Sequence, residues 1–167
     1  MKLNELQKLL SKLSETDLPS KLSTLVNWHK DIIILGNGGS NSIASHLSQD
    51  YTKALNKKCV SFSDPSRLTC YTNDYGQDKA YEKFLQTFSN KGCLVILISS
   101  SGESKNIINC LKYCQDNKLA HVILTGFSEN NLLKKASEQT AELSYWVDSD
   151  DYGIVENLHQ ILLHSVI

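Results

Sequence analysis

Two histidines and two carboxylates lie on helix-like stretches near opposite ends of the chain. His46 and Asp50 are four residues apart, so a helix over 41–55 would present both on one face. Glu156 and His164 lie on a second helix-like stretch near the C-terminus. Taken alone, an i, i+4 His/Asp pair is typical of a surface ion pair. Together, two imidazoles and two carboxylates could hold a divalent transition metal such as zinc.

A serine-rich segment, residues 99–104, follows the most apolar run of the chain. Its hydroxyl side chains are Ser99, Ser100, Ser101 and Ser104. A following helix needs only one or two of these as N-caps. The additional hydroxyls, together with the free amides of a helix N-terminus, suit a phosphate monoester held by hydrogen bonds. We call this segment the serine loop.

A second loop, residues 36–40, is rich in glycine and also stands between a strand-like run and a helix-like stretch. Its candidate ligand-binding residues are Asn37, Gly38, Gly39 and Ser40. Glycine lets the backbone approach a ligand closely, although many such turns are merely tight. The spacing matches neither the dinucleotide fingerprint nor the P-loop of nucleoside triphosphatases. We call this segment the glycine loop.

Strand-like and helix-like runs alternate five times and would position these loops. The expected strands are 32–35, 59–62, 93–98, 121–124 and 143–147, and the expected helices are 41–55, 78–88, 105–116, 132–137 and 154–167. Two further helices precede them, one carrying leucines from Leu3 to Leu13 and one over 20–28. This alternation predicts an α/β fold, an open parallel sheet with helices on both faces. Ligands of such sheets bind beyond the carboxyl ends of the strands.

Bulk composition is that of an ordinary globular protein. The 167 residues carry a formal net charge of -1, which gives no basic surface for duplex nucleic acid. The start of the chain does not resemble a signal peptide, and no apolar run is long enough to cross a bilayer. We therefore expect one cytoplasmic domain over 1–167, with a helical segment at 1–30 and the sheet core at 31–167. The five cysteines include no CxxC pair and are interpreted as free thiols.

From about residue 31 to 167 the chain resembles the phosphoheptose isomerase family of SIS (sugar isomerase) proteins. The glycine loop, the serine loop and the order of the strands resemble the SIS fold, and the histidine positions resemble this family in particular. The segment that contains Asn73 and Asp74 is similar to the family's Asn-Asp-aromatic-Gly segment, and it implies a role for both residues in substrate binding. The implied fold is a five-stranded parallel sheet with helices on both faces and additional N-terminal helices.

The resemblance also implies a reaction and the residues that perform it. The reaction would be the isomerisation of sedoheptulose 7-phosphate to D-glycero-D-manno-heptose 7-phosphate, which supplies heptose units for a glycan such as lipopolysaccharide or capsule. Asp50 would act as general base and His164 as its partner acid. His46, Asp50, Glu156 and His164 would hold a divalent metal, expected to be zinc, and Glu156 would also contact substrate. No organic cofactor is required.

Three positions depart from the family pattern: Asp50 replaces a glutamate, Glu156 a glutamine, and Ala54 an arginine. An aspartate draws the base back by about 1.5 Å, and displacements of about 1 Å can cost on the order of a hundredfold in rate. These departures leave open an isomerase for a related sugar phosphate. A non-catalytic SIS protein that binds or senses a sugar phosphate, or serves as an adaptor, is the alternative from another class.

The family further implies a homotetramer with active sites between subunits, and neither nucleic acid nor a membrane as partner. An apolar terminal helix that needs a cover agrees with this expectation. Among the other histidines, His159 could pair with Glu156, three residues away. His29 and His121 are assigned no role.

Overall fold

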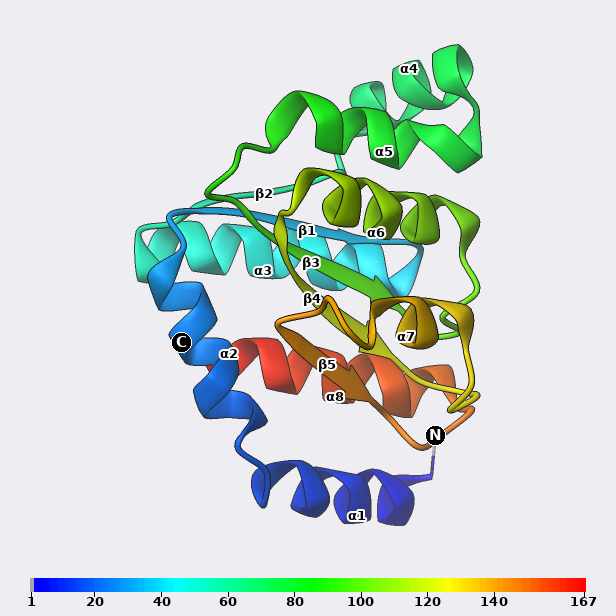
Figure 1. The fold of residues 1–167 in the computed structure, drawn as a ribbon. Coiled ribbons are helices and arrows are strands. Elements are labelled where there is room, and N and C mark those ends of the chain that lie inside the picture. The colour runs from blue at the N-terminus through cyan, green and yellow to red at the C-terminus, as the bar shows by residue number, and fades with distance from the viewer. Residues whose placement is uncertain (1) are drawn as a thin grey trace.

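The computed structural model describes residues 2–167 and shows five parallel strands between two layers of helices (Figure 1). The strands are β1 (Asp31–Gly36), β2 (Lys58–Ser61), β3 (Leu94–Ser99), β4 (Ala120–Thr125) and β5 (Leu143–Trp146). The helices are α1 (Leu3–Ser14), α2 (Leu18–Trp28), α3 (Gly39–Leu55), α4 (Pro65–Tyr75), α5 (Gln77–Phe88), α6 (Lys105–Asn117), α7 (Leu132–Ser137) and α8 (Tyr152–His164). The predicted α/β fold class is confirmed.

The strands are ordered β2-β1-β3-β4-β5, and every neighbouring pair is parallel. β3 lies between β1 and β4, and all six of its residues are buried. Helices cover both faces of a parallel sheet, so its central strands are continuously apolar. This explains why the run 93–98 is the most hydrophobic segment of the sequence.

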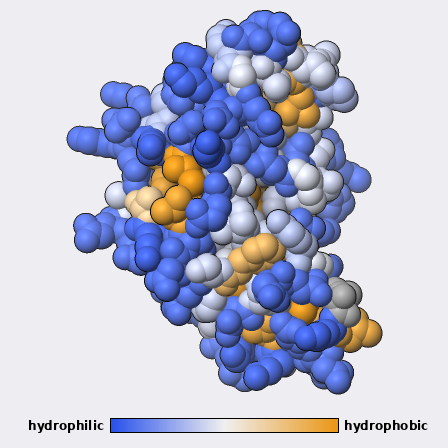
Figure 2. All heavy atoms as spheres, turned by 90° about the vertical axis from the view of Figure 1, so that its right-hand side faces the viewer, coloured by the Kyte–Doolittle hydropathy of each residue, from blue (hydrophilic) through white to orange (hydrophobic). Residues whose placement is uncertain are grey.

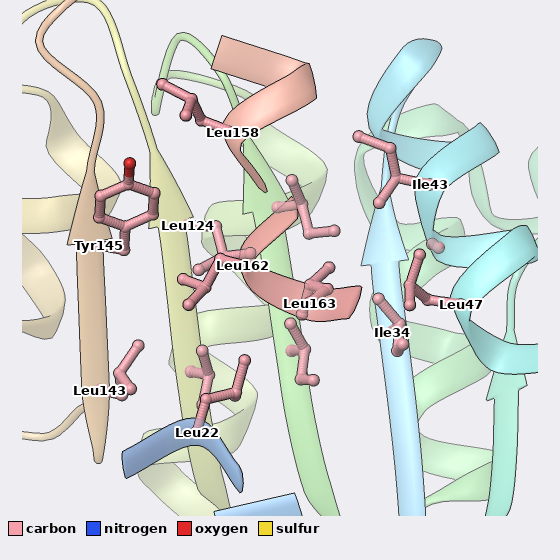
Figure 3. Packing of buried hydrophobic residues seen from close by; sticks show 14 of the residues in the cluster. Leu22, Ile34, Ile43, Leu47, Leu124, Leu143, Tyr145, Leu158, Leu162 and Leu163 are labelled. Atoms are coloured by element: carbon pink, nitrogen blue, oxygen red, sulfur yellow. The ribbon is translucent and has the colours of Figure 1, made fainter. Parts of the chain in front are cut away.

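Two apolar clusters fill the space between the sheet and the helices, one on each face of the sheet. One contains side chains of α1, α2, α3 and α8 against one face of the sheet, and Figure 3 labels residues of this cluster from α2, α3, α8, β1, β4 and β5. The other contains side chains of α5, α6 and α7 against the opposite face. α1 and α2 contribute Leu9, Leu13, Leu22 and Val26, so the leucine stripes ahead of the sheet cover the domain itself.

The terminal helix differs from expectation in its end and in its cover. α8 ends at His164 instead of Ile167. Leu158, Leu162 and Leu163 are fully buried within the chain, against α3 and the N-terminal helices. A partner subunit is therefore not needed to cover the apolar face of α8, and that part of the argument for an oligomer was wrong. The exposed large apolar residue of its last turns is Ile161.

Helix α4 is absent from the elements expected from the sequence. Asp64 caps it, accepting a hydrogen bond from the Arg67 amide at 2.9 Å, and Pro65 occupies its first turn. Aspartate followed by proline is a helix-start signal. α4 fully buries none of its residues; Leu68 and Tyr71 are partly buried against the core, a weaker signal than that of the other helices.

No helix in residues 2–167 is both long enough and apolar enough to span a bilayer.

Candidate active site

The glycine and serine loops meet at the carboxyl ends of β1 and β3. These strands are adjacent, and the strand order reverses between them, which is where ligands bind in sheets of this order. A pocket of about 250 Å³ lies there. Its lining comprises Asn37, Gly38, Gly39, Ser40, Ile98, Ser99, Ser100, Ser101, Ser104, Tyr152 and Glu156. Every predicted residue of the two loops therefore faces one cavity, which we call the loop pocket.

Two helices begin at the loop pocket without side-chain caps. α3 starts after Gly38, whose φ of 54° favours glycine, and α6 starts after Ser104. Asp or Asn side chains cap α4, α7 and α8, whereas α1, α2 and α5 also lack a side-chain cap. The first amides of a helix carry partial positive charge and seek an acceptor. An anion in the pocket could serve as that acceptor for both helices.

The serine hydroxyls are arranged by short contacts within their loop. Ser99 Oγ donates to Ser104 Oγ at 3.2 Å, and Ser101 Oγ accepts from the Glu103 amide at 3.2 Å. The buried Ser100 Oγ has no partner among the described residues. A buried hydroxyl without a partner is unfavourable, and a bound acceptor or water would relieve this.

A pair of asparagines links the two loops. Asn37 Nδ2 donates to Asn106 Oδ1 at 2.9 Å, and Asn106 Nδ2 donates back to Asn37 Oδ1 at 2.8 Å. The side chain predicted to contact a ligand therefore bonds the first turn of α6. Asn106 was missed because the sequence does not show that it is buried and therefore needs a polar partner.

His46 and Asp50 on α3 lie against His164 on α8. Asp50 Oδ2 is 3.2 Å from His46 Nε2 and 3.3 Å from His164 Nε2, and the two imidazole centroids are 5.2 Å apart. The three side chains are partly exposed, at 54%, 31% and 35% for His46, Asp50 and His164. We call this group the His/Asp cluster. The predicted base and acid are therefore in contact within one chain.

The donor set of the His/Asp cluster fits a metal ion. One ligand atom from each residue lies within 4.8 Å of the others. Ligands at 2.0–2.1 Å from a tetrahedral zinc ion are separated by about 3.4 Å. His164 Nδ1 donates to the Gln160 carbonyl at 3.0 Å, which leaves the Nε2 lone pair directed at Asp50. This second hydrogen bond is a common feature of metal-binding histidines.

Glu156 does not join the His/Asp cluster, so the geometry does not support the predicted metal role of this residue. Its carboxylate packs against Gly39 at the start of α3, where a Cβ atom would overlap it. Glu156 lines the loop pocket and also a neighbouring hollow of about 350 Å³ that reaches His46. Burial raises the pKa of this carboxyl group above its usual value.

Asn73 and Asp74 are not brought to the loop pocket. Both are exposed on α4, and Asn73 donates to the Asp74 carboxylate at 3.0 Å. Conversely, Tyr152 lines the pocket but was not predicted. The sequence does contain a signal, because Tyr152, Glu156, Gln160 and His164 recur every four residues and share one face of α8.

The remaining histidines have structural surroundings. His159 is fully buried and its Nε2 bonds the Thr125 carbonyl at 3.0 Å, so it does not pair with Glu156. His121 is buried between the Leu119 carbonyl and the Thr140 hydroxyl. His29 bonds the Gly92 carbonyl at 2.9 Å.

Comparison with known proteins places this site in a family. No family model matches the chain. The phosphoheptose isomerase of Fusobacterium nucleatum is 30% identical over 152 residues, covering 88% of this chain and 76% of the relative. That of Aliarcobacter butzleri is 30% identical, covering 96% and 88%. The solved phosphoheptose isomerase of Neisseria gonorrhoeae superposes with a TM-score of 0.87 at 23% identity, covering 98% of this chain and 92% of the other.

A five-stranded parallel sheet whose β1 and β3 ends carry a glycine loop and a serine loop defines an SIS domain. Within that class, the length and identity of the sequence matches are decisive. The chain belongs to the phosphoheptose isomerase family.

Proposed function

We propose that this protein interconverts sedoheptulose 7-phosphate and D-glycero-D-manno-heptose 7-phosphate. The observation that carries the proposal is the placement of two elements of one site: a polar loop pocket at the start of α3, and the His/Asp cluster farther along the same helix. Relatives named phosphoheptose isomerase support the choice of reaction. Figure 2 shows the side to which the arrowheads of β3 and β4 point in Figure 1, and it is mainly hydrophilic, as a sugar-binding face should be.

The spacing along α3 suits a long sugar phosphate. His46 is six positions after Ser40 and Asp50 is ten positions after it, so these pairs are about 9 Å and 15 Å apart along the axis. An extended chain gains about 1.3 Å per bond, which places C2 of a heptulose 7-phosphate about 9 Å from phosphorus. C2 of a triose phosphate would be only about 4 Å away. The site is therefore too long for a triose phosphate.

Each side chain has a role in the proposed mechanism. The Asp50 carboxylate removes the proton from the carbon next to the carbonyl group and returns it to the adjacent carbon. In the metal-free site His164 Nε2 exchanges a proton with the substrate oxygen, and the Gln160 carbonyl fixes the orientation of this ring. Serine hydroxyls and helix amides hold the phosphoryl group, which orients the sugar chain along α3.

We further propose that His46, Asp50 and His164 hold a divalent metal, with zinc favoured by two imidazoles and one carboxylate. When bound, such a metal supplies Lewis-acid stabilisation of negative charge on the substrate oxygen.

We expect the departures at Asp50 and Ala54 to change which substrate is bound and to leave the geometry of the His/Asp cluster intact. Asp50 is short, yet its Oδ2 reaches both imidazoles, so the missing methylene does not separate base and acid. Ala54 is exposed on the next turn of α3 and provides no positive charge there. An isomerase for a related sugar phosphate is therefore the second candidate.

We also propose that the protein forms a homotetramer in the cytoplasm. His164 opens onto a hollow of about 510 Å³ beside the exposed Ile161, a place where a second subunit could complete the site. Light scattering at micromolar concentration tests the assembly, and a stable monomer would contradict it.

Turnover tests the function. The protein is stripped with chelator, reloaded with zinc, and incubated with sedoheptulose 7-phosphate while the aldose is followed by NMR. We expect aldose to form with zinc and to fall at least tenfold without it. Fructose 6-phosphate serves as the shorter-chain comparison. Binding of sedoheptulose 7-phosphate without turnover under either condition would favour a non-catalytic sugar-phosphate sensor or adaptor.

A further inference from the structure

The loop pocket contains a carboxylate where the proposed ligand carries negative charge. Its lining includes the glycine loop, the serine loop, Tyr152 and Glu156, and Glu156 is its one charged residue. Neither lysine nor arginine lines it: Lys105 at the start of α6 is exposed, and Arg67 stacks on Phe88 at 4.9 Å.

The Glu156 carboxylate lies beside the N-terminus of α3. It packs against Gly39, the first residue of α3, whose N-terminus has no side-chain cap. Among the described residues no hydrogen bond or ion pair holds the Glu156 side chain. The half-buried carboxylate therefore benefits from the positive end of α3 without a directional bond that would fix it.

A hollow next to the loop pocket could accommodate the Glu156 side chain in another rotamer. Gly39 and Glu156 line both the loop pocket and the hollow that reaches His46. That hollow measures about 350 Å³ and includes Ser42, Asn157 and Gln160, all polar. A change of rotamer would carry the Glu156 carboxylate out of the loop pocket without moving α8.

We propose that Glu156 is a tethered competitor of the phosphoryl group: in the free protein its carboxylate occupies the amide end of α3, and it must be displaced before a phosphate monoester binds. The inference rests on the proposed function only in that the loop pocket receives a phosphoryl group. Glu156 thus weakens phosphate affinity and sets how readily product leaves. Like charges a few ångströms apart in a half-exposed pocket weaken binding by roughly ten- to a hundredfold.

The test compares the whole protein with E156Q and the matched control E103Q. Glutamine keeps the size of the side chain and removes the charge. Glu103 lies in the serine loop, is exposed, does not line the pocket, and accepts the Leu132 amide through Oε1 at 3.0 Å, a contact that glutamine retains. Affinity for inorganic phosphate is measured by calorimetry at pH 8 in low salt, and zinc affinity and turnover of sedoheptulose 7-phosphate are measured on the same samples.

We expect E156Q to bind phosphate at least tenfold more tightly than the parent, and E103Q to stay within about twofold of it. Equal or weaker binding by E156Q would overturn the inference. Weaker zinc binding by E156Q with unchanged phosphate affinity would overturn it too, and would make Glu156 a metal ligand. No phosphate binding by any variant would refute both the inference and the proposed function. A tenfold gain without turnover in any variant would leave the inference standing and refute the isomerase alone.

Discussion

The buried His159 should make the folded state sensitive to mild acid. Its Nε2 donates to the Thr125 carbonyl, so Nδ1 carries the lone pair, and Nδ1 has no partner in residues 2–167. Burial lowers the pKa of this imidazole to about 4, and the bond to Thr125 offsets only part of that effect. A proton on Nδ1 would place an unpaired charge among the apolar residues between α8 and the sheet.

The size of the stability loss follows from the pKa values of His159 in the folded and the unfolded chain. In the unfolded chain the pKa is about 6.5, so as the pH falls the unfolded state takes up the proton first. The stability contributed by neutral His159 is thus complete above about pH 6.5, falls between there and pH 4, and levels off below. At 1.36 kcal/mol per pH unit the loss is about 2 kcal/mol at pH 5 and about 3 kcal/mol at pH 4.

Urea unfolding at pH 8 and pH 5 measures this loss. The parent is compared with H159Q, which cannot titrate, and with H29Q, which removes a partly exposed imidazole. H159Q is less stable than the parent at pH 8, but between the two pH values it should lose about 2 kcal/mol less. H29Q should follow the parent. Equal losses for the parent and H159Q would refute the reasoning.

Three further predictions concern other parts of the chain. D50N should lower turnover roughly a hundredfold or more and weaken zinc binding, by NMR assay and calorimetry; unchanged turnover would exclude the proposed base. G102A should destabilise the fold by about 2 kcal/mol or more in urea, because φ is 68° and a Cβ would overlap Asn131; a smaller loss would mean that the serine loop relaxes freely. Of the five thiols, exposed Cys70 alone should react rapidly with DTNB at pH 8, because burial raises the pKa of the other four; rapid reaction of two or more would show local opening.

The sequence predicts the sheet well because its signals are local. Apolar runs that end in glycine or serine loops define β1 and β3, and the strand order brings both loops to the point where it reverses. α4 was not expected because few of its residues are apolar and none is fully buried, even though Asp64 and Pro65 mark its start. Apolar periodicity indicates a buried helix face, and capping residues indicate the ends of a helix. A helix on the surface is therefore best predicted from its capping residues.

The site shows a different limit. Glu156 and His164 lie two turns apart on α8, about 12 Å along the axis, and only His164 meets His46 and Asp50. Spacing predicts the face of a helix that a residue occupies and not which neighbour from another helix it meets. That is why the grouping of His46, Asp50 and His164 came from resemblance and not from spacing, and why spacing did not indicate that the Glu156 carboxylate packs against Gly39.

Helix α3 carries both the phosphate-binding residues and the catalytic residues of the proposed site. Because a helix is rigid, it sets the length of the substrate that fits. Inserting one residue between Ser40 and His46 would turn the imidazole by about 100° away from α8. The spacing can change only by whole turns of about 5.4 Å, the length of roughly four carbon–carbon bonds. Evolution or design could therefore not retune this helix by a single carbon atom, and adjustment of that size has to be made in the loops.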